Sequence, residues 1–234
     1  MSDNDILQVC DVAKVYQRGG HNVRVLNSVS LDVPRGDFVA LMGPSGSGKT
    51  TLLNIIGGLD SPTSGSVIVD GTSIAELSDR GLAEWRSSNI GFVFQQYNLI
   101  PVLSALENVE IPLLLFRMKK AERRRRALAA LDLVGLTERA HHLPRQMSGG
   151  EEQRTSIARA LVTDPKLIIA DEPTGNLDAA AAANVLDLLE RLNREMKKTI
   201  LMVTHDPAAA ERANRLARLY KGDLSSDRNS EVAA

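Results

Sequence analysis

The stretch Gly43-Pro-Ser-Gly-Ser-Gly-Lys-Thr50 decides the fold of this chain. It follows the apolar run Phe38–Met42, which predicts a buried parallel strand, and it precedes Thr50–Gly57, which predicts a helix. The stretch fits G-x-x-x-x-G-K-[ST], in which glycines let successive backbone N–H groups turn toward one anion at the positive end of a helix. Lys49 can reach nucleotide β- and γ-phosphates, and the Thr50 hydroxyl suits Mg²⁺. The predicted binding residues are Gly43, Pro44, Ser45, Gly46, Ser47, Gly48, Lys49, Thr50 and Thr51.

A second apolar run, Leu167–Ala170, ends in two acidic residues, Asp171 and Glu172. The carboxyl ends of parallel strands meet at one edge of a sheet, so Asp171 is predicted to lie beside the phosphate loop and to hold Mg²⁺. Glu172 is one residue further and can polarise an attacking water. Two surface acids at a strand end are the alternative, which the phosphate loop disfavours. Together the two motifs predict a nucleotide-hydrolysing site.

Composition narrows the class of protein. The 234 residues are 43% hydrophobic, enough for one large domain or two small ones. The 28 basic and 29 acidic residues nearly cancel, which gives no electrostatic case for a nucleic-acid binder. One cysteine excludes an internal disulfide, and no apolar run approaches the roughly 20 residues of a membrane span. With an acidic N-terminus in place of a secretory signal, the sequence predicts a soluble cytoplasmic chain that meets a membrane through a partner.

Patterns along the chain predict an α/β core interrupted by helices. Strands are predicted at Leu7–Val15, Val25–Val33, Ser66–Val69 and Thr199–Val203, with an edge strand and turn at Leu216–Leu224. Leu103–Val134 is mostly helical, and Glu152–Val162 and Ala179–Glu195 are helices. We therefore expect a core with an N-terminal β subdomain at about 1–96 and 161–224, a helical subdomain at about 97–160, and a disordered tail at 225–234.

The segment Met147-Ser-Gly-Gly-Glu151, followed by Gln153-Arg154 and Ile157-Ala-Arg-Ala-Leu161, resembles the signature segment of ATP-binding cassette (ABC) ATPases. It lies about twenty residues before Asp171, as in that family, and the resemblance extends from about Leu7 to Leu224. It implies an α/β fold of the P-loop NTPase class, with an ABC-type core, an antiparallel β subdomain and an inserted helical signature subdomain.

The resemblance also assigns site residues. Tyr16 matches the aromatic residue that stacks on adenine, and Gln95 matches the glutamine that senses Mg²⁺ and the γ-phosphate. Asp178 ends a loop, Gly175-Asn-Leu-Asp178, that communicates across a dimer, and His205 matches the γ-phosphate histidine. The resemblance thus implies Lys49, Glu172 and His205 as catalytic residues, and Thr50, Gln95 and Asp171 as metal ligands. ATP and Mg²⁺ are the implied cofactors.

Ser148-Gly149-Gly150 can expose backbone N–H groups at a helix start, which makes a second anion site. The family joins its two half-sites in a head-to-tail homodimer, so Ser148, Gly149 and Gly150 of one chain are expected to close on ATP held by Lys49 of the other. Met147 and Glu151 stand where the commonest signature has Leu and Gln. Met conserves volume, whereas the charge of Glu151 could slow closure.

Further motifs, among them Gly57–Gly65 and Gly91–Pro101, resemble the lipoprotein-release and macrolide-efflux ATPases and the related cell-division ATPase. The implied partners are integral-membrane permease subunits, with a periplasmic adaptor as a further candidate and no nucleic acid. The implied location is the cytoplasmic face of the inner membrane, held there by the permease. The alternatives are a soluble ABC-type ATPase acting on nucleic acid or ribosomes, a P-loop small-molecule kinase, and a non-catalytic scaffold.

Two surface features extend this interpretation. The apolar loop Tyr97–Leu103 is expected to receive a short permease helix, unless it is an internal wedge; Leu99 and Leu103 are the expected contacts. The basic run Lys119–Arg126 is a solvated helix face by default, with anionic headgroups or acidic permease loops as the alternative partners.

Overall fold

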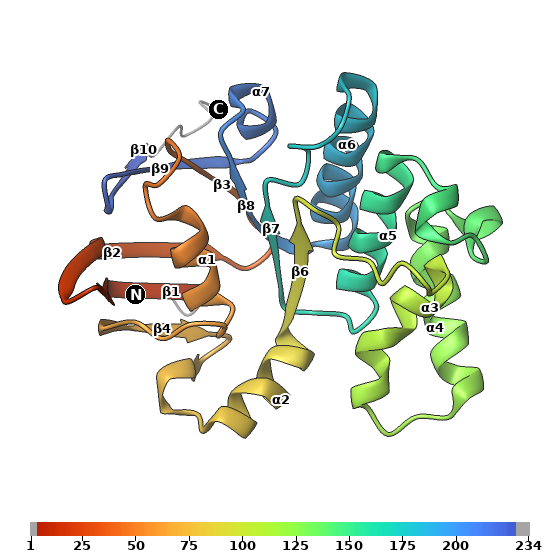
Figure 1. The fold of residues 1–234 in the computed structure, drawn as a ribbon, viewed down its shortest axis with the longest axis horizontal. Helices are drawn as coiled ribbons and strands as arrows, with labels where there is room; N and C mark the ends of the chain where they lie inside the picture. The colour runs from red at the N-terminus through yellow and green to blue at the C-terminus, as the bar shows by residue number, and fades with distance from the viewer. Residues whose placement is uncertain (1–3, 228–234) are drawn as a thin grey trace.

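The computed structural model describes residues 4–227 and contains two sheets with helices packed around them (Figure 1). The larger sheet has six strands in the order β10-β9-β3-β8-β7-β6. In chain order they are β3 (Phe38–Met42), β6 (Ile90–Phe94), β7 (Leu167–Asp171), β8 (Thr199–Thr204), β9 (Arg215–Tyr220) and β10 (Asp223–Asp227). All pairs are parallel except β9 with β10. The carboxyl ends of five strands therefore meet at one edge.

The smaller sheet is antiparallel and begins with the two strands between Asp5 and Pro34. Its order is β2-β1-β4-β5. β1 (Asp5–Arg18) and β2 (His21–Pro34) form a long hairpin, and β4 (Ser64–Val69) and β5 (Thr72–Ser73) complete the sheet. This arrangement and the parallel sheet together confirm the predicted fold class.

The helices are divided between the two halves of the molecule. Those beside the antiparallel sheet are α1 (Lys49–Ile56), the 3₁₀ turn η1 (Ile74–Glu76) and α2 (Asp79–Asn89). The segment after β6 holds α3 (Ala105–Glu110), η2 (Ile111–Leu115), α4 (Lys120–Leu133), η3 (Thr137–Arg139), η4 (Pro144–Gln146) and α5 (Gly149–Leu161). α6 (Ala179–Met196) and α7 (Pro207–Ala210) follow β7 and β8. Among residues 4–227, no helix is both long and apolar enough to cross a bilayer.

Two hydrophobic cores lie on opposite faces of the parallel sheet. Along β3, Phe38 and Ala40 join the core shared with α3–α6, whereas Val39 and Leu41 join the core shared with α1 and the antiparallel sheet. Side chains of a strand alternate between faces, so a continuous apolar run is what a strand covered on both sides requires. The buried sheet thereby fixes the position of the loops at its carboxyl edge.

Several sequence predictions need correction. β10 pairs with β9, so β9 is an internal strand, and residues 225–227 belong to β10 instead of to a disordered tail. Residues 228–234 of that predicted tail lie outside the described residues. α5 begins at Gly149, three residues earlier than predicted, because Ser148 caps it. β6 and α2 were not predicted. The sequence of α2 lacks the helical spacing of apolar residues, because none of its side chains is buried.

Candidate nucleotide-binding site

The loop between β3 and α1 follows the carboxyl edge of the parallel sheet. Lys49 is only 8% exposed, and its Nζ donates hydrogen bonds to the carbonyl oxygens of Gly43 (2.7 Å) and Pro44 (3.0 Å). A Cβ added to Gly43 would lie 2.1 Å from the Leu219 carbonyl oxygen, and Gly48 has φ +104°. Both positions therefore require glycine, because a side chain would meet backbone or need a left-handed conformation.

The inner surface of this loop fits a phosphate group. Ser45 and Gly46 are exposed, whereas Ser47 is buried. The Ser47 hydroxyl has no hydrogen-bond partner among the described residues, although buried polar atoms are generally paired. The loop opens at the N-terminus of α1, where backbone N–H groups lack helical partners. The arrangement supplies unpaired polar groups, a buried cation and a helix dipole to one anion.

Two oxygen donors meet beside the loop. The Thr50 hydroxyl donates to Asp171 Oδ2 at 3.4 Å. Burial and the nearby charge of Glu172 raise the pKa of Asp171, while Thr50 and Lys49 lower it less. A hydroxyl and a carboxylate suit Mg²⁺, which usually binds one or two protein carboxylates together with phosphate oxygens and water. The pair fits a Mg²⁺ that completes its shell with nucleotide.

Glu172 and His205 are in direct contact. His205 Nδ1 lies 2.9 Å from Glu172 Oε2, and the backbone N–H of His205 donates to the same oxygen at 3.3 Å. Glu172 has φ +48°, a conformation that is uncommon for a residue with a side chain, and its N–H donates to Val203. The Glu172 side chain is 15% exposed and that of His205 67%. β7 and β8 thus present a shielded carboxylate held by an exposed imidazole.

Gln95 follows β6 at the same edge of the sheet, since Phe94 pairs with Asp171. Its Nε2 donates to Asn176 Oδ1 at 3.2 Å, and Asn176 Nδ2 donates to the Gln95 carbonyl at 3.0 Å. Gln95 forms no hydrogen bond with Thr50 or Asp171 within residues 4–227. The structure therefore links Gln95 to the loop that ends at Asp178, and within residues 4–227 it does not hydrogen-bond Gln95 to the other two predicted metal ligands.

Tyr16 lies at the far end of the site, on β1. With Val23, Val25 and Thr51 it lines a hollow of about 310 Å³ that also includes Gly46, Gly48, Lys49 and Thr50. The Tyr16 hydroxyl donates to Asp60 Oδ2 at 2.6 Å. Burial, followed by the hydrogen bond to Asp60, raises the pKa of Tyr16. The hollow joins an aromatic ring to the phosphate loop, as a nucleotide requires.

The signature segment forms the start of α5. Ser148 Oγ accepts from the Glu151 N–H at 3.3 Å, and Glu151 Oε2 accepts from the Ser148 N–H at 2.8 Å, which is a capping box. Glu151 Oε1 lies 3.1 Å from Arg139 Nε. The hydrogen bond from the Ser148 backbone N–H lowers the pKa of Glu151, and its effect is larger than the opposite effect of burial. The charge of Glu151 is therefore paired within the chain, and an effect of Glu151 on closure stays a prediction.

The signature lies apart from the phosphate loop of its own chain. In Figure 1, α1 and α5 stand on opposite sides of β6 and β7. Ser148 and Gly149 are exposed, whereas Gly150 is buried, and a Cβ on Gly150 would lie 3.1 Å from Ala181 Cβ. Asp178 is exposed and caps α6 by accepting from the Ala181 N–H at 2.8 Å. The signature and the phosphate loop of one chain are therefore separate surfaces.

Some residues that hold the site were missed by the sequence analysis. Gln153 is fully buried and its Nε2 donates to the carbonyls of Phe94 (3.3 Å) and Pro173 (2.6 Å), which ties the segment before Gln95 to the one after Glu172. Asn176 holds Gln95 as described above. Their roles depend on contacts between segments about 20 to 80 residues apart, for which a single sequence carries no spacing rule.

The comparisons agree with this geometry. The family model described as ABC transporter matches residues 26–175. The lipoprotein-releasing system ATP-binding protein LolD of Bordetella avium is 50% identical over 213 residues, which cover 91% of this chain and 93% of that protein. The dimeric structure of MJ0796, a bacterial ABC transporter cassette, has a TM-score of 0.87 and 45% identity, covering 96% of this chain and all of that one. A post-hydrolysis dimer of MJ0796 bound to ADP and Pi matches with a TM-score of 0.87 and 44% identity.

The matched region holds the phosphate loop, Gln95, the signature segment, Asp171 and Glu172. The family model spans more than half of the chain, and the relatives cover nearly all of it. The chain therefore belongs to the ABC transporter family, in which it is the ATP-binding and ATP-hydrolysing subunit.

Proposed function

We propose that this chain forms a head-to-tail homodimer around two Mg²⁺–ATP molecules and drives a membrane permease of the lipoprotein-release or macrolide-efflux type. The observation that carries the proposal is the convergence of the Lys49 loop, the Thr50–Asp171 pair and the Glu172–His205 pair at one sheet edge. The separation of the signature from this edge supports the dimer, because a second chain is needed to bring Ser148 to the phosphates.

The protein groups divide the reaction between them. The loop N–H groups and Lys49 hold the β- and γ-phosphates, whose oxygens replace the Gly43 and Pro44 carbonyls as partners of Lys49. Tyr16 stacks on adenine, with Thr51 beside it. Thr50 and Asp171, with Gln95 as a third ligand, would hold Mg²⁺, which supplies positive charge against the phosphate oxygens. Ser148, Gly149 and Gly150 of the second chain close the site, and Asp178 lies at the dimer face.

Glu172 is the general base in this proposal. A water oxygen attacks the γ-phosphorus, its proton passes to the Glu172 carboxylate, and the bond to the β–γ bridging oxygen breaks to leave ADP. His205 fixes the carboxylate through its backbone N–H and its ring, and its exposed ring can turn toward the γ-phosphate. Catalysis then comes mainly from positioning and charge stabilisation, so the output is a change between open and closed dimers.

A hollow of about 420 Å³ between α2 and the helical segment supports the coupling to a permease. Its lining includes Leu59, Phe92 and Leu115, of which Leu59 is 49% and Leu115 72% exposed. In the adjoining loop Val102 is 79% exposed, whereas the predicted contacts Leu99 and Leu103 are half-buried. The most exposed apolar side chains offered to a short permease helix by the hollow and this loop are therefore Leu115 and Val102.

Co-expression of the chain with its permease tests this coupling. Val102→Asp and Leu115→Asp should leave ATP hydrolysis by the isolated chain at the native rate and reduce the amount of permease that co-purifies. Lys221→Asp, on a turn far from the hollow, serves as the control. Undiminished co-purification of both variants would contradict the proposed permease contact. A soluble ATPase that acts on nucleic acid or ribosomes would instead co-purify with RNA or ribosomes and with no membrane protein.

A further inference from the structure

The segment from Arg117 to Arg126 carries a concentration of positive charge that the catalytic proposal does not use. It contains seven lysine and arginine side chains and one acidic side chain, Glu122, in a chain whose formal net charge is −1. Glu122 is occupied by Arg125 (2.9 Å) and Arg126 (2.8 Å). Arg117, Lys119 and Lys120 are exposed and form no ion pair or side-chain hydrogen bond with any residue between 4 and 227. Three cations therefore face solvent without a partner in the described part of the chain.

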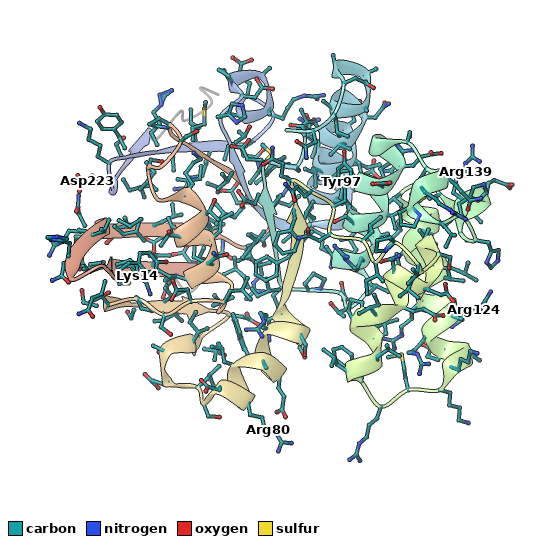
Figure 2. All side chains as sticks on the ribbon, in the orientation of Figure 1. Lys14, Arg80, Tyr97, Arg124, Arg139 and Asp223 are labelled. Carbon is teal, nitrogen blue, oxygen red and sulfur yellow. The ribbon has the colours of Figure 1, made fainter. Side chains whose placement is uncertain are left out.

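Two leucines precede these cations and are equally exposed. Leu114 is 60% and Leu115 72% exposed, while their neighbour Leu113 is buried and anchors η2 to the core. Leu115 also lines the hollow proposed for the permease helix. The loop that leads from η2 to α4 lies at the lower edge of the molecule in Figure 1, as does α2, and Arg124 extends from α4 in Figure 2. The leucines and cations thus continue the side of the molecule that the permease would contact.

We propose that Leu114, Arg117, Lys119 and Lys120 form a membrane-contact surface that binds anionic lipid headgroups beside the permease, while Leu115 faces the permease hollow. Exposed cations in the η2–α4 loop and at the start of α4 suit the diffuse charge of a bilayer surface, and the adjacent exposed Leu114 can enter the region between headgroups and acyl chains. Each basic side chain near such a surface contributes about 1 kcal/mol, so three correspond to an affinity change of about 10²-fold. The orientation of this surface toward the bilayer depends on the proposed permease contact.

Vesicle sedimentation with the full chain tests the inference. The chain should bind vesicles of phosphatidylcholine and phosphatidylglycerol, release them as salt is raised, and not bind phosphatidylcholine alone. The combined variant Arg117→Glu, Lys119→Glu, Lys120→Glu should lose at least about 10²-fold in apparent affinity. A matched variant, Arg194→Glu, Lys197→Glu, Lys221→Glu, makes the same change in net charge at exposed sites at the end of α6 and in the turn between β9 and β10, and it should bind as the native chain does.

ATP hydrolysis and permease co-purification separate this inference from the proposed function. Both variants should hydrolyse ATP at the native rate, and Lys119→Gln, Lys120→Gln replaces the combined variant if that variant fails to fold. Equal vesicle binding by the two charge variants would overturn the inference. Loss of permease co-purification with vesicle binding unchanged would also overturn it, since the cations would then contact an acidic segment of the permease. Either result would leave the ATPase proposal intact.

Discussion

The attachment of Tyr16 to its surroundings yields a prediction about nucleotide affinity. Lys14 Nζ lies 2.6 Å from Asp60 Oδ1, and the Tyr16 hydroxyl donates to Asp60 Oδ2 at 2.6 Å. The Lys14 ammonium also lies 4.7 Å from the centroid of the Tyr16 ring. Asp60 therefore fixes the ring, and Lys14 occupies one of its faces, which leaves the other face for adenine. We expect Asp60→Asn to weaken ATP binding without touching the reacting atoms.

The size of the effect follows from these contacts. Hydrogen bonds to charged groups contribute about 1.5–3 kcal/mol and neutral ones about 0.5–1.5 kcal/mol. The substitution keeps an acceptor for Tyr16 but removes the charge, so it costs about 1 kcal/mol of positioning, or about a fivefold rise in KM for ATP. Stacking of a base on an aromatic ring contributes about 1–3 kcal/mol, which sets the upper limit of the effect. kcat should not change, because no hydrogen bond or ion pair among residues 4–227 joins Asp60 to Glu172 or His205.

Steady-state hydrolysis over a range of ATP concentrations separates the expected rise in KM from the unchanged kcat. Asp70→Asn is the matched control, because Asp70 is also an acidic residue of the β subdomain paired with a basic side chain, Arg35, and is of similar exposure. Tyr16→Ala establishes whether the ring binds adenine at all. If Tyr16→Ala raised the KM for ATP and Asp60→Asn did not, the proposal that Asp60 holds the Tyr16 ring in place would be refuted. Equal KM values for Tyr16→Ala, Asp60→Asn and Asp70→Asn would show that the Tyr16 ring does not bind adenine.

Three further predictions concern the phosphate loop and the signature. Lys49→Ala should abolish ATP binding in equilibrium titration, since the buried ammonium is the charge that faces the phosphates; affinity within about threefold of native would contradict this. Gly43→Ala should lower the free energy of unfolding by about 1–3 kcal/mol in urea titration, because its Cβ would meet the Leu219 carbonyl, and an unchanged midpoint would show that the loop can move away. Glu151→Gln should cost less than about 1 kcal/mol at pH 7, because glutamine keeps the capping box and loses only the part-exposed pair with Arg139. The pKa of Glu151 is lowered in the folded chain, so the Glu151 charge adds fully to stability above the unfolded pKa of about 4.3 and stops adding as pH falls through the folded pKa. The native chain and Glu151→Gln should therefore have similar free energies of unfolding in acid and differ most near neutral pH.

The motifs that lie within a few consecutive residues could be predicted from the sequence. The phosphate loop, the strand that ends in Asp171 and the capped start of the signature helix each follow from local patterns, and the structure brings Thr50 and Asp171 within contact. The links between distant segments could not be predicted. Gln153 reaching Phe94 and Pro173, and Glu151 reaching Arg139, depend on how helices pack on the sheet.

The error at the C-terminus has a different physical cause. Residues 225–227 are small and polar, but this part of β10 is held by backbone pairing with β9, which places no demand on side-chain hydropathy. Leu99 and Leu103 were predicted as surface contacts because the loop is apolar. Asn108 binds the backbone of Ile100 and Leu103 from within the fold and turns Val102 outward instead.

The central claim is that two chains enclose ATP and that Glu172 activates the water. The most direct test is the molar mass of Glu172→Gln in ATP and Mg²⁺, measured by size-exclusion chromatography with light scattering, together with bound ATP and released phosphate. Gln keeps the shape of the side chain but removes the base, which typically costs about 10²–10⁴ in rate. The account predicts a stable dimer that retains two ATP molecules and releases little phosphate. A monomer that binds ATP, or hydrolysis near the native rate, would contradict it.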